Sequence, residues 1–116
     1  MAPTSDSLPP IINRQDAVER LGGDEEMLTE FLGMLLEQAQ TMLPEIAQAI
    51  EANDASGVEQ AGHSLKGAAA SLGAERMRHA AYAIEIIGRS GNLEQAGQAL
   101  GYLQEQVTLL RQALEG

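Results

Sequence analysis

The sequence predicts an all-α fold, and three observations lead to this prediction. The 116 residues include one Phe, two Tyr and no Trp, whereas Ala, Leu, Glu and Gln are frequent, a composition that suits helices better than strands. Apolar residues recur at steps of three and four along most of the chain. Short breaks rich in Gly, Asn and Ser separate these segments, which favours an antiparallel up-down-up-down four-helix bundle.

The chain is expected to begin with a leader and a short helix. Residues 1–10 contain Pro and Ser with few apolar side chains and end in a Pro pair, so we expect a flexible leader or linker there. The folded domain is then predicted over residues 11–116. Asn13 can cap a short extra helix over residues 14–21, which a Gly-Gly pair ends. This helix is expected to lie across one end of the bundle as a lid.

A long helix is predicted over residues 25–52. Asp24 is a good N-cap, and the two glutamates that follow it lie where the helix dipole favours negative charge. Pro44 lies inside this segment, where its ring removes one backbone hydrogen bond. We expect a kink near residues 40–44 rather than a division, because the apolar stripe keeps its phase across the proline. The predicted inward residues are Leu28, Phe31, Leu32, Leu35, Ala39, Met42, Ile46, Ala49 and Ile50.

Two further helices are predicted over residues 55–72 and 75–89. Asp54 can cap the first, and Gly73 can end it in a conformation that glycine adopts at little cost. A Ser-Gly-Asn break ends the second. Their predicted inward residues are Val58, Leu65, Ala69 and Leu72, and then Met77, Ala80, Ala81, Ile84 and Ile87.

The last helix is predicted to follow Asn92 directly. Asn92 with Gln95 three residues later has the spacing of a capping box. The apolar residues after it keep a three-four alternation, which is typical of a helix in a bundle. They are Leu93, Ala96, Leu100, Leu103, Val107, Leu110 and Leu114.

The charge and residue content exclude several classes of function. A net charge of −10 with seven Lys and Arg argues against binding to nucleic acid or to an anionic membrane surface, but it suits a partner with a basic rim. The absence of cysteine leaves neither a disulfide framework nor a thiolate metal site. No apolar run approaches the roughly 20 residues that span a bilayer. We therefore expect a cytoplasmic protein.

The stretch from Ala61 to Gly73 has the character of a chemical site. At about 100° per residue, one helix face carries His63, Lys66, Gly67 and Ala70, and this face lies opposite the predicted core face. A neutral imidazole is a good nucleophile near neutral pH, so an exposed histidine can carry a phosphoryl group. Lys66 can meet the phosphoryl oxygens, while Gly67 and Ala70 lower the surface for a close approach by another protein. Glu59, one turn before His63, could accept the other ring N–H.

These residues resemble the signature of a known family. His63-Ser-Leu-Lys66-Gly67, followed by Ser71-Leu72-Gly73-Ala74, is similar to the His-x-x-Lys-Gly and downstream Leu-Gly motif of histidine-containing phosphotransfer (HPt) domains of two-component phosphorelays. The resemblance covers about residues 11–114. It implies that His63 takes a phosphoryl group from the aspartyl phosphate of a response-regulator receiver domain and passes it to the aspartate of another.

The resemblance also implies roles for partners and neighbouring residues. Lys66 orients the phosphoryl group, Gly67 gives the receiver room, and Ser71 supports the site. A hybrid sensor histidine kinase belongs to the same relay, and the receiver supplies Mg²⁺, so the chain is expected to need no cofactor or metal of its own. Since the sequence has no phosphate-binding loop, the protein is expected to be a carrier and not a kinase. A monomer is the simplest expectation.

The fourth predicted helix departs from the family pattern. Its residues near the phosphohistidine are often amide or basic in the family, whereas this chain has Glu85 there. A carboxylate disfavours the phosphorylated form, so Glu85 is left out of the predicted site. Ser64, Ala70 and Arg89 are kept as possible docking or outer contacts.

Two other functions stay open. A non-catalytic helical adaptor would dock a signalling partner through the small-residue face around Gly67. A metal-binding bundle would use the i, i+4 pairs Glu59–His63 and Glu75–His79, although di-iron bundles use Glu-x-x-His with inward glutamates instead. His79 lacks the Lys-Gly context and is predicted to be a plain surface residue.

Overall fold

The computed structural model describes residues 8–115, and the predicted all-α class is confirmed there. This part of the chain forms five helices and no strand. Residues 1–7 of the expected leader and residue 116 lie outside the described residues. The helices are α1 (Arg14–Arg20), α2 (Glu25–Glu51), α3 (Ala55–Ser71), α4 (Glu75–Ser90) and α5 (Ala96–Glu115).

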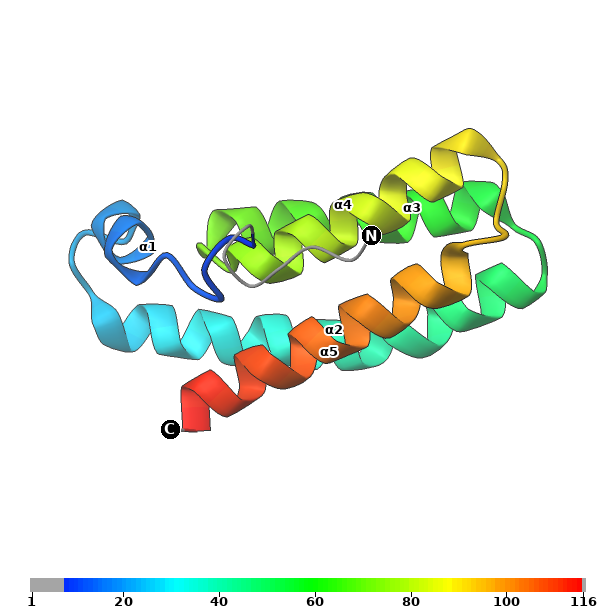
Figure 1. The fold of residues 1–116 in the computed structure, drawn as a ribbon. Coiled ribbons are helices and arrows are strands. Elements are labelled where there is room, and N and C mark those ends of the chain that lie inside the picture. Colours follow the sequence, from blue (N-terminus) through cyan, green and yellow to red (C-terminus); the bar gives the residue numbers. More distant parts are fainter. Residues whose placement is uncertain (1–7, 116) are drawn as a thin grey trace.

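The four long helices lie side by side and reverse direction at each connection (Figure 1). α3 packs mainly against α4. α2 packs against α3 and α5, and α5 also packs against α4, so the core lies among the four helices. None of the helices in residues 8–115 has the length and apolarity needed to cross a membrane. Fully buried core side chains come from each of the long helices, and the largest are Leu28, Leu32, Ile46, Val58, Leu65, Met77, Ile84, Leu103 and Leu110.

Three predicted helix caps are confirmed. The side chain of Asn13 accepts the backbone N–H of Asp16 at 3.3 Å at the start of α1. Asp24 begins α2 and Asp54 begins α3 with equivalent bonds at 3.0 Å. These side chains satisfy N–H groups that have no partner within the helix, which explains why the predicted starts agree with the structure.

Helix α1 and its cap residue are hydrogen-bonded to the C-terminal end of α3. The backbone N–H of Asn13 donates to the carbonyl of Gly73 at 2.7 Å. The Arg20 guanidinium donates to the carbonyls of Ala70 at 2.8 Å and Ser71 at 3.3 Å. The last carbonyls of a helix have no partner within it, so α1 stabilises the C-terminal end of α3 by supplying donors.

Helix α2 runs without interruption through Pro44. Pro44 is exposed, while Leu35 and Ala39 before it and Ile46 after it are buried. The core contacts on both sides hold the two halves in one helix, so the possible division of this segment does not occur.

Two details of the predicted elements are wrong. Phe31 is exposed, because Leu28, Leu32 and Leu35 occupy the inward line of α2. Helix α5 begins at Ala96, not after Asn92, because the Asn92 side chain accepts the backbone N–H of Glu94 at 3.0 Å. This bond closes a local turn in place of a helix cap, and Leu93 lies outside the helix. The other predicted inward residues that are half-buried still pack against the core, except Ile87, and they are Met42, Ala49, Ile50, Leu72, Leu93 and Leu114.

The contact between α3 and α4 is made backbone to backbone at two glycines. A Cβ atom on Gly62 would lie 2.5 Å from the backbone nitrogen of Glu85. A Cβ atom on Gly88 would come even closer to the backbone nitrogen of Glu59. Side chains at these positions would force the helices apart, so the two glycines set the distance between α3 and α4.

Replacing Gly62 with Ala should destabilise the domain. The added methyl group meets backbone atoms of α4 that cannot rotate away, so we expect the free energy of unfolding to fall by about 1–3 kcal/mol in urea titrations followed by circular dichroism. Gly101→Ala in α5 is the matched control, since a Cβ there meets nothing within 4 Å. The control should raise the free energy of unfolding by up to about 1 kcal/mol. Equal effects of the two substitutions would contradict the close contact at Gly62.

Candidate functional site

His63 lies on the solvent face of α3, as predicted. Its side chain is 70% exposed, and its Nδ1 atom lies 3.1 Å from Oε2 of Glu85 on α4. On the opposite face of α3, Val58, Leu65 and Ala69 are buried in the core. The helix therefore presents an exposed imidazole whose position is fixed from below by one carboxylate.

Glu85, which the sequence analysis leaves out of the predicted site, contacts three of the residues that it includes, His63, Lys66 and Arg89. Glu85 is 2% exposed. Its Oε1 atom lies 2.7 Å from Nζ of Lys66, and its Oε2 atom lies 2.7 Å from Nη2 of Arg89 as well as facing His63. The hydrogen bond from Lys66 lowers the pKa of Glu85 most, burial opposes it, and His63 lowers the pKa further. The carboxylate is therefore ionised at neutral pH.

The sequence contains a signal for Glu85 that composition alone does not reveal. Position 85 follows Ala81 by four residues and precedes Gly88 by three, and both of these residues are buried against α3. Helical periodicity therefore predicts an inward-facing position. A glutamate at such a position needs cationic or N–H partners, since an unpaired buried carboxylate is costly.

Glu59 does not bind His63, contrary to the suggested role. Its Oε2 atom lies 3.1 Å from Nε of Arg89, and this hydrogen bond is the main cause that raises the pKa of Arg89. Glu85 takes the position beside the imidazole instead. Arg89, kept as an outer contact, joins the two carboxylates and holds α4 against α3.

Lys66 lies close to His63 in sequence, but its ammonium group contacts α4. Besides its ion pair with Glu85, Nζ lies 5.2 Å from the centre of the Tyr82 ring, a distance at which cation–π attraction operates. The side chain is only partly exposed. Lys66 is thus held at the edge of the site by two groups from α4.

The small residues around His63 differ in their surroundings. Gly67 is exposed, and a Cβ atom there would meet nothing within 4 Å, so the fold itself does not require glycine. Ser71 donates its hydroxyl to the carbonyl of Gly67 at 3.0 Å, within α3. Ser64 is exposed and Ala70 is half-buried. These residues leave a low surface beside the imidazole.

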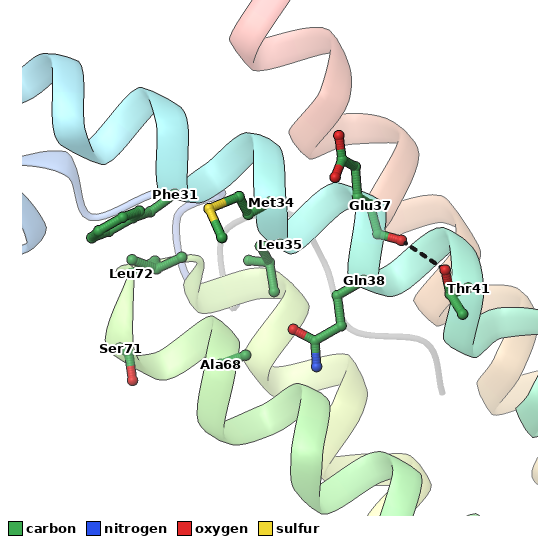
Figure 2. A pocket seen from close by; sticks show the side chains of 9 residues that line it. All are labelled: Phe31, Met34, Leu35, Glu37, Gln38, Thr41, Ala68, Ser71 and Leu72. Carbon is green, nitrogen blue, oxygen red and sulfur yellow. Dashed lines mark hydrogen bonds between the residues drawn. The ribbon is translucent and has the colours of Figure 1, made fainter.

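An apolar groove runs between α2 and α3 (Figure 2). Figure 2 shows Phe31 and Met34 of α2 next to Leu72 of α3, with Ala68 and Ser71 along the same wall. Met34 is 61% exposed and Phe31 is 36% exposed. The sequence analysis missed this groove, although exposed Met27, Phe31 and Met34 are spaced by four and three residues and so form a second apolar line on α2.

The chain was compared with models of known protein families. A family model described as the Hpt domain matches residues 30–113. The chain belongs to the Hpt domain family. The match includes His63, Lys66, Gly67 and the whole of α3 and α4. Histidine phosphotransfer in phosphorelays is the function that this membership supports.

Two relatives illustrate the similarity of this Hpt domain to known proteins. It is 28% identical over 85 residues to the phosphorelay intermediate protein rdeA of Dictyostelium discoideum, a match that covers 73% of this chain and 34% of that protein. The chain thus spans about a third of the length of this relative. The crystal structure of histidine-containing phosphotransfer protein B from Pseudomonas aeruginosa PAO1 superposes with a TM-score of 0.82 at 19% identity, covering 91% of this chain and 92% of that one. The second similarity shows that the fold is shared.

The second histidine of the Hpt domain is exposed, as predicted, but it has a partner. Nδ1 of His79 lies 3.3 Å from the hydroxyl of Tyr102, and the two rings meet edge to face.

Within residues 8–115 no group of three or more His, Cys, Asp or Glu side chains could hold a metal ion.

Substituting Glu85 with Gln should change how stability depends on pH. A lowered pKa means that the folded state binds this proton less readily than the unfolded state. The carboxylate therefore stabilises the Hpt domain above the ordinary value of 4.5 and loses this effect as pH falls through its lowered pKa. We expect the wild type to be more stable than Glu85→Gln near neutral pH, and the difference in free energy of unfolding to shrink as the pH falls below 4.5. A difference that grows on acidification would contradict the ionised, paired state of Glu85.

Proposed function

We propose that this Hpt domain carries a phosphoryl group on His63 between aspartates of response-regulator receiver domains in a two-component phosphorelay. The observation that carries the proposal is the exposed imidazole with Nδ1 turned towards Glu85. Within residues 8–115 no hydrogen bond engages Nε2, so this nitrogen is the one available to a partner. The partners are then receiver domains and a hybrid sensor histidine kinase.

The proposed reaction is a transfer between two proteins. The Nε2 lone pair of His63 attacks the phosphorus of the receiver's aspartyl phosphate, an N–P bond forms, and the acyl P–O bond breaks to release the aspartate carboxylate. Onward transfer reverses these steps on a second receiver. Mg²⁺ belongs to the receiver in this scheme, and the chain acts as a carrier rather than an enzyme with its own nucleotide chemistry.

Lys66 is proposed to orient the phosphoryl group. An ammonium group has three N–H donors, and Glu85 Oε1 engages Nζ at 2.7 Å. The remaining donors can turn towards phosphoryl oxygens on the neighbouring imidazole. The ion pair with Glu85 thus keeps the Lys66 ammonium beside the site before His63 is phosphorylated.

The receiver is proposed to dock over Gly67 and into the groove between α2 and α3. Gly67 and Ser64 provide a low surface next to His63, and Phe31 and Met34 provide exposed apolar area. Such area gains free energy when a partner covers it. Ala70 and Ser71 border the same surface, whereas Arg89 lies on the α4 side and contributes through Glu85.

The architecture suits this role. We propose that α2 to α5 form an antiparallel up-down-up-down four-helix bundle with α1 as a short accessory helix, and that the domain acts as a cytoplasmic monomer. In this arrangement α3 presents His63 outwards while α4 supports it from behind. The second candidate function, a non-catalytic adaptor, would use the same groove without the chemistry of His63.

Replacing His63 with Gln should abolish phosphotransfer. We expect incubation with a labelled, phosphorylated receiver domain to yield an acid-labile, base-stable label on the wild type and on His79→Gln, and none on His63→Gln. His79→Gln is the matched control, because it removes an exposed histidine that lies outside the site. Label that persists on His63→Gln would contradict the proposal. Receiver binding without any label on the wild type would favour the adaptor function.

Enlarging Gly67 should weaken docking without harming the fold. Gly67→Gln places a side chain into open space on the proposed docking surface, so we expect the dissociation constant for a receiver domain to rise about tenfold in a binding titration. Gly101→Gln on α5 adds the same side chain to another open position and should leave binding unchanged. Unaltered affinity of Gly67→Gln would exclude this turn of α3 from the docking surface.

A further inference from the structure

We propose that Tyr82 of α4 is a positioning residue for phosphotransfer that acts through Lys66. The Tyr82 ring keeps the Lys66 ammonium beside His63, so that this one cation can contact Glu85 and an incoming phosphoryl group at the same time. The inference rests on the function proposed above. It adds to that function a residue that the sequence analysis does not place in the site.

The Lys66 ammonium lies between two groups of α4. Its Nζ atom is 2.7 Å from Oε1 of Glu85 and 5.2 Å from the centre of the Tyr82 ring. Tyr82 and Glu85 are three residues apart in one helix and are therefore neighbours on its surface. Lys66 comes from α3 and meets both of them. The position of this cation is thus defined by the opposite helix.

The two partners hold Lys66 by different forces. The Glu85 carboxylate is negatively charged and accepts a short hydrogen bond from the ammonium. The Tyr82 ring is neutral, and the electron density of its face attracts a cation without neutralising it. The ring therefore orients Lys66 and leaves its positive charge available to a second anion.

The ring is also the partner that lies towards solvent. Tyr82 is 45% exposed, whereas Glu85 is buried and Lys66 is partly exposed. A lysine has a flexible four-carbon stem and a strongly hydrated ammonium group, so it turns into solvent readily when little holds it. The contact with Tyr82 opposes this movement and favours the conformers in which Lys66 stays at the site.

Phosphorylation of His63 increases the need for this contact. A phosphoryl group on Nε2 brings a second anion towards Glu85, and the two anions share one ammonium. An ammonium has three N–H donors, and Glu85 engages it through Oε1. The ring competes with neither anion for a strong hydrogen bond. Lys66 can then bridge the carboxylate and the phosphoryl oxygens instead of exchanging one for the other.

Ile86 separates this role of Tyr82 from a role as apolar area for a docking partner. It follows Tyr82 by four residues on α4 and is also exposed. It presents apolar area on the same side of the helix but has no ring that could face a cation. Loss of apolar area can therefore be tested at Ile86 without changing the surroundings of the Lys66 ammonium.

The experiment uses phosphoramidate, a small phosphoryl donor, so that no docking surface takes part. The rate at which phosphohistidine forms at His63 is followed by ³¹P NMR in wild type, Tyr82→Leu, Tyr82→Phe, Lys66→Ala and the double variant Tyr82→Leu/Lys66→Ala. Such a cycle measures whether two residues act together. His79 lies outside the site and reports the reactivity of the donor in the same sample.

We expect Tyr82→Leu to slow phosphorylation of His63 about two- to fivefold, which is the range that cation–π attraction gives at an exposed site. Tyr82→Phe keeps the ring and should match the wild type. In the Lys66→Ala background Tyr82→Leu should have no further effect, because the cation that the ring retains is gone. Ile86→Ala should match the wild type, and His79 should react equally in every variant.

An unchanged rate in Tyr82→Leu would overturn the proposal. So would a slowing that persists in the Lys66→Ala background, or one that Tyr82→Phe or Ile86→Ala shares.

A second measurement tests the contact itself and needs no phosphorylation. An aromatic ring shifts the resonances of protons that lie over its face, so we expect the ε-CH₂ protons of Lys66 to be shifted upfield in the wild type and in Tyr82→Phe but not in Tyr82→Leu. Absence of this shift in the wild type would refute the role of Tyr82. If both measurements agree with the proposal but no receiver transfers a phosphoryl group to His63, the relay function fails and the role of Tyr82 stands.

Discussion

The crossing of α3 and α4 at Gly62 and Gly88 is the constraint on which the site depends. Gly62 directly precedes His63, and Gly88 directly precedes Arg89. Because neither position has a side chain, the two backbones come within contact distance, and a carboxylate on α4 reaches the imidazole on α3. The contact between Glu85 and His63 thus depends on close packing between the two helix backbones as well as on charge.

The cost of burying Glu85 is offset by two cationic side chains. A buried carboxylate requires partners, and here they are Lys66 from α3 and Arg89 from α4. The Lys66–Glu85 ion pair joins the two helices and holds Lys66 beside His63. Fold and site therefore share one set of contacts, so the site cannot be rearranged without loosening the contact between α3 and α4.

The fold could be predicted from the sequence wherever a local signal decides the outcome. Asn13, Asp24 and Asp54 cap the predicted helices because a cap needs only its next three residues. Asn92 shows the limit of such signals. Its side chain can accept a backbone N–H either in a turn or at a helix N-cap, and the sequence alone does not decide between the two.

The site was harder to predict in full. His63, Lys66 and Gly67 share a face that follows from helical periodicity alone. The choice of Glu85 over Glu59 as the partner of His63 depends on how α4 is set against α3, which a pattern within one helix does not contain. The exposure of Phe31 likewise depends on which of two apolar lines on α2 meets the core.

Gly67 has a further consequence for the dynamics of α3. A glycine inside a helix costs about 0.5–1 kcal/mol relative to alanine. At Gly62 this cost is offset by close packing, but at Gly67 no contact within the domain offsets it. The exposed turn that follows His63 is therefore intrinsically less stable than the turn before it. Local opening of α3 is therefore expected to concentrate at this exposed turn, and its backbone amides should exchange with solvent sooner than those packed on α4.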